Sequence, residues 1–301
     1  MQESARTILR LRKRTNIFIH MVFAFFSVLC IIPLMAVISI SLSREEDILQ
    51  FGYKFIPPHI TGMAYRAIFK SPDKIISAYT NSILVTVTGT ICSMIVLILL
   101  AYPLSRKDYK YRNIFSFYIF FTMLFSGGIV PWYILIARYL NMRDTFFVLF
   151  VPYLVNVWYV LLLKTYFRDI PVSLLESANI DGASEMRILI SVVLPLSKPA
   201  LATVSLFIVL QFWNDWWLSL LFINKESLVT LQYLLYKMMR NMDYLRNNVS
   251  QMVQGMIDTS NLPTETMRMA MCIVAAGPML IIFPFFQKYF VRGLTVGAVK
   301  G

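Results

Sequence analysis

The sequence has 301 residues, of which 58% are apolar, and a formal net charge of +12 at pH 7. This apolar share is well above that of soluble domains, so most classes of water-soluble protein are excluded and a membrane protein is indicated. The basic residues occur in blocks between long apolar runs, which is a topology signal of membrane proteins and no sign of nucleic-acid binding. Cys30, Cys92 and Cys272 lie within apolar runs at no metal-ligand spacing, so neither a metal site nor a disulfide framework is predicted.

Six apolar runs are long enough to cross a bilayer as helices of about 20 residues. The predicted spans are approximately 16–42, 79–103, 114–137, 146–166, 199–222 and 270–290. They predict an all-α integral membrane protein, with residues 1–301 forming a single polytopic domain. Within the third run, Gly127-Gly128 and Pro131 predict a kink, which would serve either close helix packing or a gating hinge.

The distribution of basic residues predicts the orientation of the spans. With both termini in the cytoplasm, the inner segments hold 16 of the 28 Lys and Arg residues, most densely in 104–113 and at the C-terminus. The first run follows a basic stretch that ends at Arg14, as in a signal peptide, but its apolar part is much longer than a signal peptide requires. We therefore expect an uncleaved membrane anchor.

The segment 167–198, between the fourth and fifth runs, is too polar to insert as a span. Pro171 can open a short helix, because the first turn of a helix does not need its missing N–H. Asp181-Gly182 can end that helix, since glycine readily adopts the left-handed conformation of a C-cap, and Ser184 can cap a second helix. The sequence thus predicts a helix–turn–helix elbow on the basic side of the membrane.

Three short stretches in this elbow carry a resemblance to a known family. They are Glu176-Ser177-Ala178, Asp181-Gly182-Ala183 and Leu194-Pro195-Leu196. Their order and spacing resemble the EAA signature of ABC importer permeases, with Ser177 in place of the usual alanine. The resemblance implies the type I ABC importer fold, in which the elbow is a cytoplasmic coupling helix between spans four and five. It also implies a set of ATPase-coupling residues, namely Glu176, Ser177, Ala178, Asp181, Gly182, Ala183 and Pro195.

The same resemblance implies a location and a set of partners. We expect a multi-pass subunit of a bacterial cytoplasmic membrane, in contact with lipid, a second homologous permease, two copies of an ABC ATPase and an extracytoplasmic solute-binding protein. The sequence has no phosphate-binding G-x-x-x-x-G-K-[ST] loop. ATP and Mg²⁺ are therefore expected to bind to the partner ATPase, while this chain is expected to hold no cofactor, no metal and no catalytic residue of its own.

Further stretches narrow the resemblance to the carbohydrate-uptake branch, in particular to the second permease of maltose-type importers. They are Asn81-Ser82, residues 101–106, Trp213-Asn214-Asp215 and the C-terminal run 287–301. The long outer segment 223–269 is similar to the subgroup associated with complex oligosaccharides. The expected cargo is therefore a carbohydrate, with an oligosaccharide favoured.

A sugar path needs flat aromatic faces for the C–H side of pyranose rings and amides or carboxylates for the hydroxyl groups. Aromatic and polar residues of this kind occur together in the fourth and fifth runs. The candidate path residues are Tyr153, Asn156, Trp213, Asn214, Asp215, Trp216 and Trp217. Packing within the protein or at the membrane interface is an alternative role for the aromatic residues, and Asp215 could instead bind a backbone amide or the other permease.

Other functions were weighed against this one. A peptide or polyamine permease is the main alternative cargo class. A secondary transporter would need ionisable groups near the middle of the membrane, and only Asp215 meets this condition. An intramembrane hydrolase would need a metal or nucleophile cluster, and neither His20 nor His59 has evident partners for one.

Overall fold

The computed structural model describes residues 2–70, 72–252 and 265–298, and the side chains of 15–70, 72–244, 265–285 and 287. Over these residues the chain is helical, and the β-structure is limited to an isolated bridge between Ser43 and Ile60. Two compact units are present. The first combines Met1–Ser71 with Met239–Ala276, and the second combines Pro72–Met238 with Gly277–Gly301.

The helices confirm the predicted all-α class. The α-helices are α1 (Gln2–Ser41), α2 (Glu45–Phe51), α3 (Met63–Ile68), α4 (Pro72–Ser105), α5 (Arg112–Leu124), α6 (Ile129–Ile134), α7 (Val157–Arg168), α8 (Val172–Ile180), α9 (Glu185–Ile188), α10 (Leu194–Leu196), α11 (Lys198–Trp213), α12 (Trp217–Phe222), α13 (Leu231–Met252) and α14 (Glu265–Ala298). Short 3-10 or π-helical turns are η1 (Leu135–Tyr139), η2 (Phe146–Leu149), η3 (Val151–Tyr153), η4 (Leu189–Val193) and η5 (Glu226–Leu228).

Three of the described helices are long and apolar enough to cross a membrane by themselves: Thr15–Ser41, Pro72–Ser105 and Glu265–Phe285. Three further candidates are pairs of helices joined at a bend. These pairs are Arg112–Leu124 with Ile129–Tyr139 at 111°, Phe146–Tyr153 with Val157–Arg168 at 54°, and Glu185–Leu196 with Lys198–Trp213 at 83°. If each pair is one span, the described helices provide up to six. The predicted span boundaries and the single domain stay predictions.

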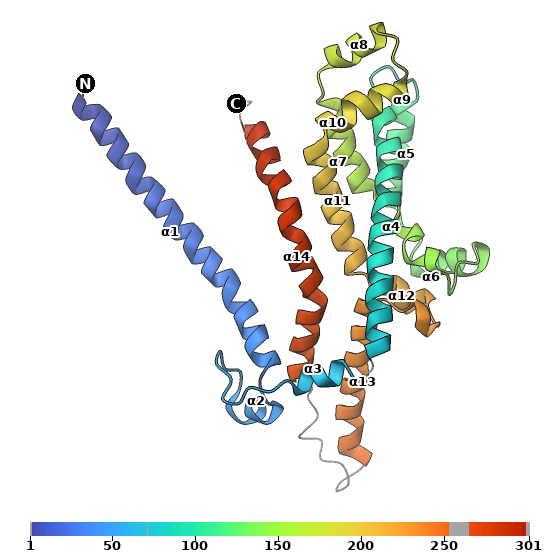
Figure 1. Ribbon diagram of the computed structural model, residues 1–301. Helices are drawn as coiled ribbons and strands as arrows, with labels where there is room; N and C mark the ends of the chain where they lie inside the picture. Colours follow the sequence, from blue (N-terminus) through green and yellow to red (C-terminus); the bar gives the residue numbers. More distant parts are fainter. Residues whose placement is uncertain (1, 71, 253–264, 299–301) are drawn as a thin grey trace. The chain divides into compact units, whose positions relative to one another are not determined.

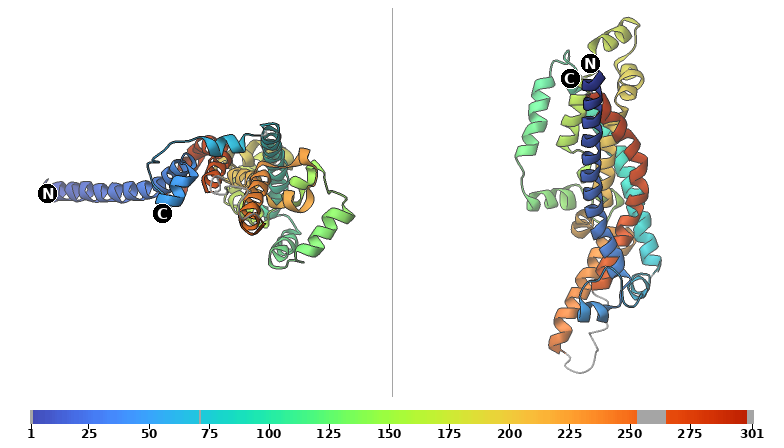
Figure 2. Two further views of the ribbon diagram at one scale, coloured as in Figure 1. Left: turned by 90° about the horizontal axis from the view of Figure 1, so that it is seen from below. Right: turned by 90° about the vertical axis from the view of Figure 1, so that its left-hand side faces the viewer.

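The third predicted run, 114–137, is divided rather than kinked. α5 ends at Leu124, and α6 begins after Gly128, whose φ of +85° is a conformation that glycine adopts readily. The 13 residues of α5 extend for about 20 Å, whereas the hydrocarbon core is about 30 Å thick. The kink predicted from Gly127-Gly128 and Pro131 is therefore a break between two helices, which meet at an angle of 111°. Figure 2 shows the sharp change of direction from α5 to α6.

The second unit is built around α4. Helices α7 and α11 both pack against α4, and α5 packs against α7 (Figure 1). On α4, small residues spaced by three or four positions are buried, among them Thr86, Gly89 and Ser93. Small residues let two helices approach closely in a membrane. The approach is tightest at Gly89, where an added Cβ would lie 2.8 Å from the buried ring of Phe212 in α11.

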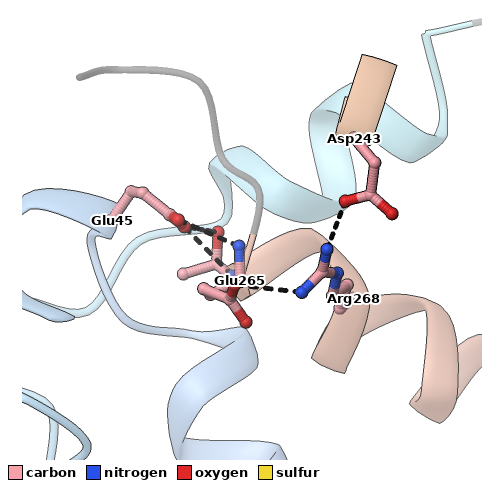
Figure 3. Close-up of polar contacts among 5 residues, drawn as sticks. Glu45, Asp243, Glu265 and Arg268 are labelled. Atoms are coloured by element: carbon pink, nitrogen blue, oxygen red, sulfur yellow. Dashed lines mark hydrogen bonds and ion pairs between the residues drawn. The ribbon is translucent and has the colours of Figure 1, made fainter. Parts of the chain in front are cut away.

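In the first unit, a carboxylate holds the start of α14 (Figure 3). Glu45 in α2 accepts hydrogen bonds from the backbone N–H groups of Glu265 and Thr266, at 2.9 and 3.0 Å, and from the Thr266 hydroxyl at 2.8 Å. Arg268, one turn further, forms ion pairs with Glu265 at 3.0 Å and with Asp243 of α13. The N-terminal end of a helix attracts negative charge, so Glu45 stabilises α14 by both hydrogen bonding and electrostatics.

The contact at Gly89 predicts a cost for adding a single methyl group. Gly89→Ala places a Cβ against the Phe212 ring, and overpacking of this kind costs about 1–3 kcal/mol. The thermal unfolding midpoint of the purified permease complex in detergent should therefore fall. Gly277→Ala is the matched control, since no atom of the described residues lies within 4 Å of the added atom, and an equal fall in both variants would contradict the packing argument.

Candidate functional site

The turn of the elbow has the geometry that its sequence predicts. Pro171 precedes α8, and Gly182 follows it with a φ of +74°. The N–H of Ala183 donates to the carbonyl of Ala178 at 3.0 Å, and the N–H of Gly182 donates to the carbonyl of Asn179 at 3.0 Å. This pair of hydrogen bonds is a Schellman motif, which ends a helix on a left-handed glycine and satisfies its last carbonyl groups. The end of α8 is therefore fixed by local bonding.

The second half of the elbow begins at the predicted cap. The Ser184 hydroxyl accepts a hydrogen bond from the N–H of Arg187 at 3.4 Å, and α9 starts at Glu185. The chain continues through η4 and α10, which contains Pro195, and then bends by 83° into α11. The predicted helix–turn–helix elbow is thus present.

The candidate coupling residues are distributed over two sides of the elbow. Glu176, Ser177, Asp181, Gly182 and Pro195 are exposed, whereas Ala178 and Ala183 are half-buried and pack against the core of the second unit. Next to them, Leu175 is buried while Ile180 is 85% exposed. An exposed apolar side chain among polar ones, on a short helix with fixed ends, is suited to contact with another protein.

A polar clasp, formed by Tyr102, Arg106 and Glu185, joins the elbow to the end of α4. The Tyr102 hydroxyl donates to Glu185 Oε2 at 2.5 Å, and Arg106 Nη2 donates to Glu185 Oε1 at 3.2 Å. Arg106 also donates to Asp108 at 3.0 Å, and its side chain is only 13% exposed. Charge-assisted hydrogen bonds are stronger than neutral ones, so this clasp restrains the start of α9. Sequence reasoning missed Glu185, although residues 101–106 had been singled out for their resemblance.

Two hollows flank the clasp. One, of about 350 Å³, lies between α8 and the ends of α4 and α7, and Glu176, Asn179, Lys107 and Arg168 are among its lining residues. The other, of about 400 Å³, has Tyr109 and Met186 in its lining. Both hollows include Tyr102 and Arg106. Movement of the elbow would therefore change the surroundings of the clasp directly.

Three of the seven candidate path residues line hollows elsewhere in the second unit. Tyr153 and Asn156 line one of about 310 Å³, and Tyr153 and Trp217 line another of about 580 Å³. Residues that the sequence did not single out complete these linings, among them Gln211, Trp158, Ser126 and Trp132. Gln211 could have been noticed as an amide within an otherwise apolar helix.

The other four candidate path residues have structural contacts. Trp213 is buried, with its ring centroid 6.4 Å from that of Tyr79, and Trp216 stacks on Tyr236 at 4.6 Å. Asn214 donates to the carbonyl of Leu210 at 2.9 Å. The carboxylate of Asp215 accepts the N–H of Leu218 at 3.1 Å, which caps α12. Three roles were open for Asp215, namely a path contact, a bond to a backbone amide and a bond to the other permease, and the structure contains the bond to a backbone amide.

Comparison with known proteins decides the family. The chain is 38% identical over 276 residues to the polygalacturonan/rhamnogalacturonan transport system permease protein YtcP of Bacillus subtilis (strain 168), a match that covers 92% of the chain and 94% of that protein. The chain belongs to the family of carbohydrate ABC transporter permeases. No protein-family model matches the sequence.

Two further comparisons agree with this assignment. The permease is 34% identical to Protein LplC of Bacillus subtilis (strain 168), over 90% of both chains. It also matches a chain in the crystal structure of a bacterial ABC transporter involved in the import of the acidic polysaccharide alginate, with a TM-score of 0.76 and 28% identity, over 92% of the permease and 97% of that chain. The predicted family and the type I importer fold are thereby confirmed, whereas the roles of individual site residues stay predictions.

The turn of the elbow yields a prediction about coupling. Gly182→Pro should abolish it, because proline cannot adopt a φ of +74°, and Glu176→Lys should weaken it by reversing an exposed charge. We expect the stimulation of ATPase activity by the loaded binding protein to fall at least tenfold in the complex with Gly182→Pro. Gly182→Asn and Glu176→Gln are the controls, since asparagine tolerates the left-handed conformation and glutamine keeps the shape of the side chain. Normal stimulation in the proline variant would contradict the coupling role.

The clasp yields a second prediction. Tyr102→Phe and Glu185→Gln remove the same hydrogen bond from opposite ends, so their effects on stimulated ATPase activity should not add in the double variant. Each single variant should lower the stimulation several-fold. Asp108→Asn is the control, because Asp108 accepts a hydrogen bond from Arg106 and takes no part in the bond between Tyr102 and Glu185. Strictly additive losses would show that the hydrogen bond does not position the elbow.

Proposed function

We propose that this permease is one of two homologous membrane subunits of an ATP-driven importer, and that its elbow engages one of two copies of a separate ATPase. The observation that carries the proposal is the elbow itself. Its turn is fixed by the bonds at Gly182, the start of its second helix, α9, is restrained by the Tyr102–Glu185 clasp, and its tip exposes Glu176, Asp181 and Ile180. A rigid, exposed element of this kind can transmit the movement of a partner to α7 and α11, which flank it.

In this proposal the ATPase performs all of the covalent chemistry. ATP and Mg²⁺ bind to the partner subunits, and this chain contributes no catalytic residue and no cofactor. ATP binding closes the two ATPase subunits, the elbows follow them, and the membrane helices open toward the binding protein outside. Both termini lie in the cytoplasm, as the distribution of Lys and Arg favours. The membrane is the bacterial cytoplasmic membrane.

We further propose that the cargo is an oligosaccharide with uronic-acid carboxylates. YtcP is named for polygalacturonan and rhamnogalacturonan, and the similar transporter structure is described as importing the acidic polysaccharide alginate. Both names refer to polysaccharides that contain acidic sugars. They therefore favour a carbohydrate cargo over the peptide and polyamine cargoes that the sequence left open.

The hollows around Tyr153 contain groups that suit such a cargo. The amides of Asn156 and Gln211 can donate hydrogen bonds to hydroxyl or carboxylate oxygens, and the rings of Tyr153 and Trp158 offer flat faces to pyranose C–H groups. Trp217 and Trp132 extend the aromatic lining on the far side of Tyr153. We therefore place the sugar path of this subunit at Tyr153, with Asn156 and Trp217 as the neighbouring contacts.

The cargo proposal predicts selective stimulation of ATP hydrolysis. In proteoliposomes that contain the whole complex, the binding protein loaded with an oligogalacturonate should raise ATPase activity several-fold, whereas the same protein incubated with neutral maltotriose should not. The reason is that only the loaded, closed binding protein engages the outer side of the permeases. If the neutral oligosaccharide stimulates ATPase activity and the oligogalacturonate does not, the acidic-sugar proposal is overturned and the importer assignment stays intact. If no carbohydrate stimulates ATPase activity, the result counts against both.

A further inference from the structure

Three cations gather where α5 begins and α7 ends. Arg112 and Ser116 lie one turn apart on α5, and Lys164 and Arg168 lie one turn apart on α7. The two helices pack against each other, and Lys164 Nζ donates a hydrogen bond to the Ser116 hydroxyl at 2.8 Å. Arg112 therefore lies one turn before the hydroxyl that Lys164 contacts, and Arg168 lies one turn after Lys164 itself. We call Arg112, Ser116, Lys164 and Arg168 the cationic cluster.

Within the described part of the chain, no ion pair involves Arg112, Lys164 or Arg168. The ion pairs in this part of the chain involve other basic residues, and Arg112 donates a hydrogen bond to the neutral amide of Asn113. Like charges held together raise the free energy of the folded chain, and an anion placed among them would lower it. Arg112 and Lys164 are half-buried, so they are shielded from water more than ordinary surface cations are.

The surroundings of the cluster are those of a membrane interface. Tyr111, just before α5, Tyr118, in the middle of α5, and Tyr166, near the end of α7, are 49%, 64% and 46% exposed. Tyrosine is enriched at the depth of the lipid headgroups. On α5 the apolar side chains of Ile114 and Phe117 are exposed as well, at 66% and 68%. An anion that reaches the cluster from the bilayer would therefore place its charge beside the cations and its apolar part along α5.

We propose that the cationic cluster binds a phosphate group, and that the phosphate is the headgroup of an anionic phospholipid. Phosphate suits the cluster because each guanidinium group can donate a pair of parallel hydrogen bonds, while the Lys164 ammonium and the Ser116 hydroxyl supply further donors. Basic clusters between helices at the membrane surface are a recurrent site for acidic headgroups. The lipid would join α5 to α7 beside the elbow. This proposal does not depend on the nature of the cargo.

The test is the retention of lipid by the intact transport complex, measured by native mass spectrometry. The complex is purified in detergent and equilibrated with equal amounts of phosphatidylglycerol and phosphatidylcholine. Wild-type complex should retain phosphatidylglycerol in preference, and Lys164→Gln with Arg168→Gln should lower that preference by about fivefold for each charge removed. Lys164→Arg keeps the charge and should keep the preference for phosphatidylglycerol. If this variant also loses the preference, the loss reflects misfolding and not the missing charge. Lys198→Gln is the control for general surface charge.

The outcomes separate the two sources of phosphate. If millimolar inorganic phosphate displaces phosphatidylglycerol in the wild type and has no effect in the double variant, the lipid headgroup and free phosphate share the site, as proposed. If inorganic phosphate binds at the cluster while phosphatidylglycerol shows no preference, the lipid source is overturned. An equal loss in Lys198→Gln, or loss of an associated subunit with unchanged lipid retention, would overturn the phosphate site itself and indicate general surface charge or a protein partner.

Discussion

The hydrogen-bonding requirement of the backbone within a bilayer governs this structure. Lipid offers no partners to N–H and carbonyl groups, so a chain that crosses it must satisfy them internally, and helices do so. Where an α-helix stops inside an apolar run, the backbone groups at its end therefore need other hydrogen-bond partners. At Asn214–Trp216 this partner is the carboxylate of Asp215, which takes the N–H of Leu218. After α5, the Ser126 hydroxyl accepts the N–H of Gly128 at 3.2 Å.

The same requirement separates the elbow from the membrane helices. The chain leaves α7 at Arg168, turns through α8 and α9, and returns through α11, and the turn between α8 and α9 lies among the polar residues Asp181 and Ser184. Because the Schellman bonds at Gly182 are local, the turn keeps its shape whatever its neighbours do. The clasp at Glu185 is long-range, joining residues 83 positions apart. The elbow thus combines an intrinsically rigid turn with an attachment that can tighten or loosen.

The features that the sequence predicted correctly are local ones. Pro171, Gly182 and Ser184 act through the conformation of their own backbone or of the next turn, so their positions alone predicted where α8 ends and α9 begins. The apolar runs predicted most of the long helices, because the length and apolar character of a run are also local properties of the sequence. Gly128 was recognised as a point of irregularity, but the 111° change of direction that follows from it depends on how α6 packs, which a single sequence does not show.

The features that the sequence missed depend on distant contacts. Nothing near Glu185 indicates that Tyr102 and Arg106 will meet it, and nothing near Trp213 indicates that Tyr79 will cover it. The aromatic residues around position 215 were therefore grouped as one path on chemical type alone. In the structure Trp217 lines a hollow with Tyr153, whereas Trp213 and Trp216 are engaged in packing.

The carboxylate that caps α14 has a consequence for biosynthesis. Glu45 is only 7% exposed, and its partner Glu265 lies 220 residues further along the chain. During synthesis, α2 is complete long before its three donors exist, and closing so long a loop is slow compared with forming a local turn. The first unit is therefore finished only when the final helix arrives. Until α14 is in place, the carboxylate of Glu45 stays hydrated. The last stage of assembly therefore includes the removal of water from this carboxylate.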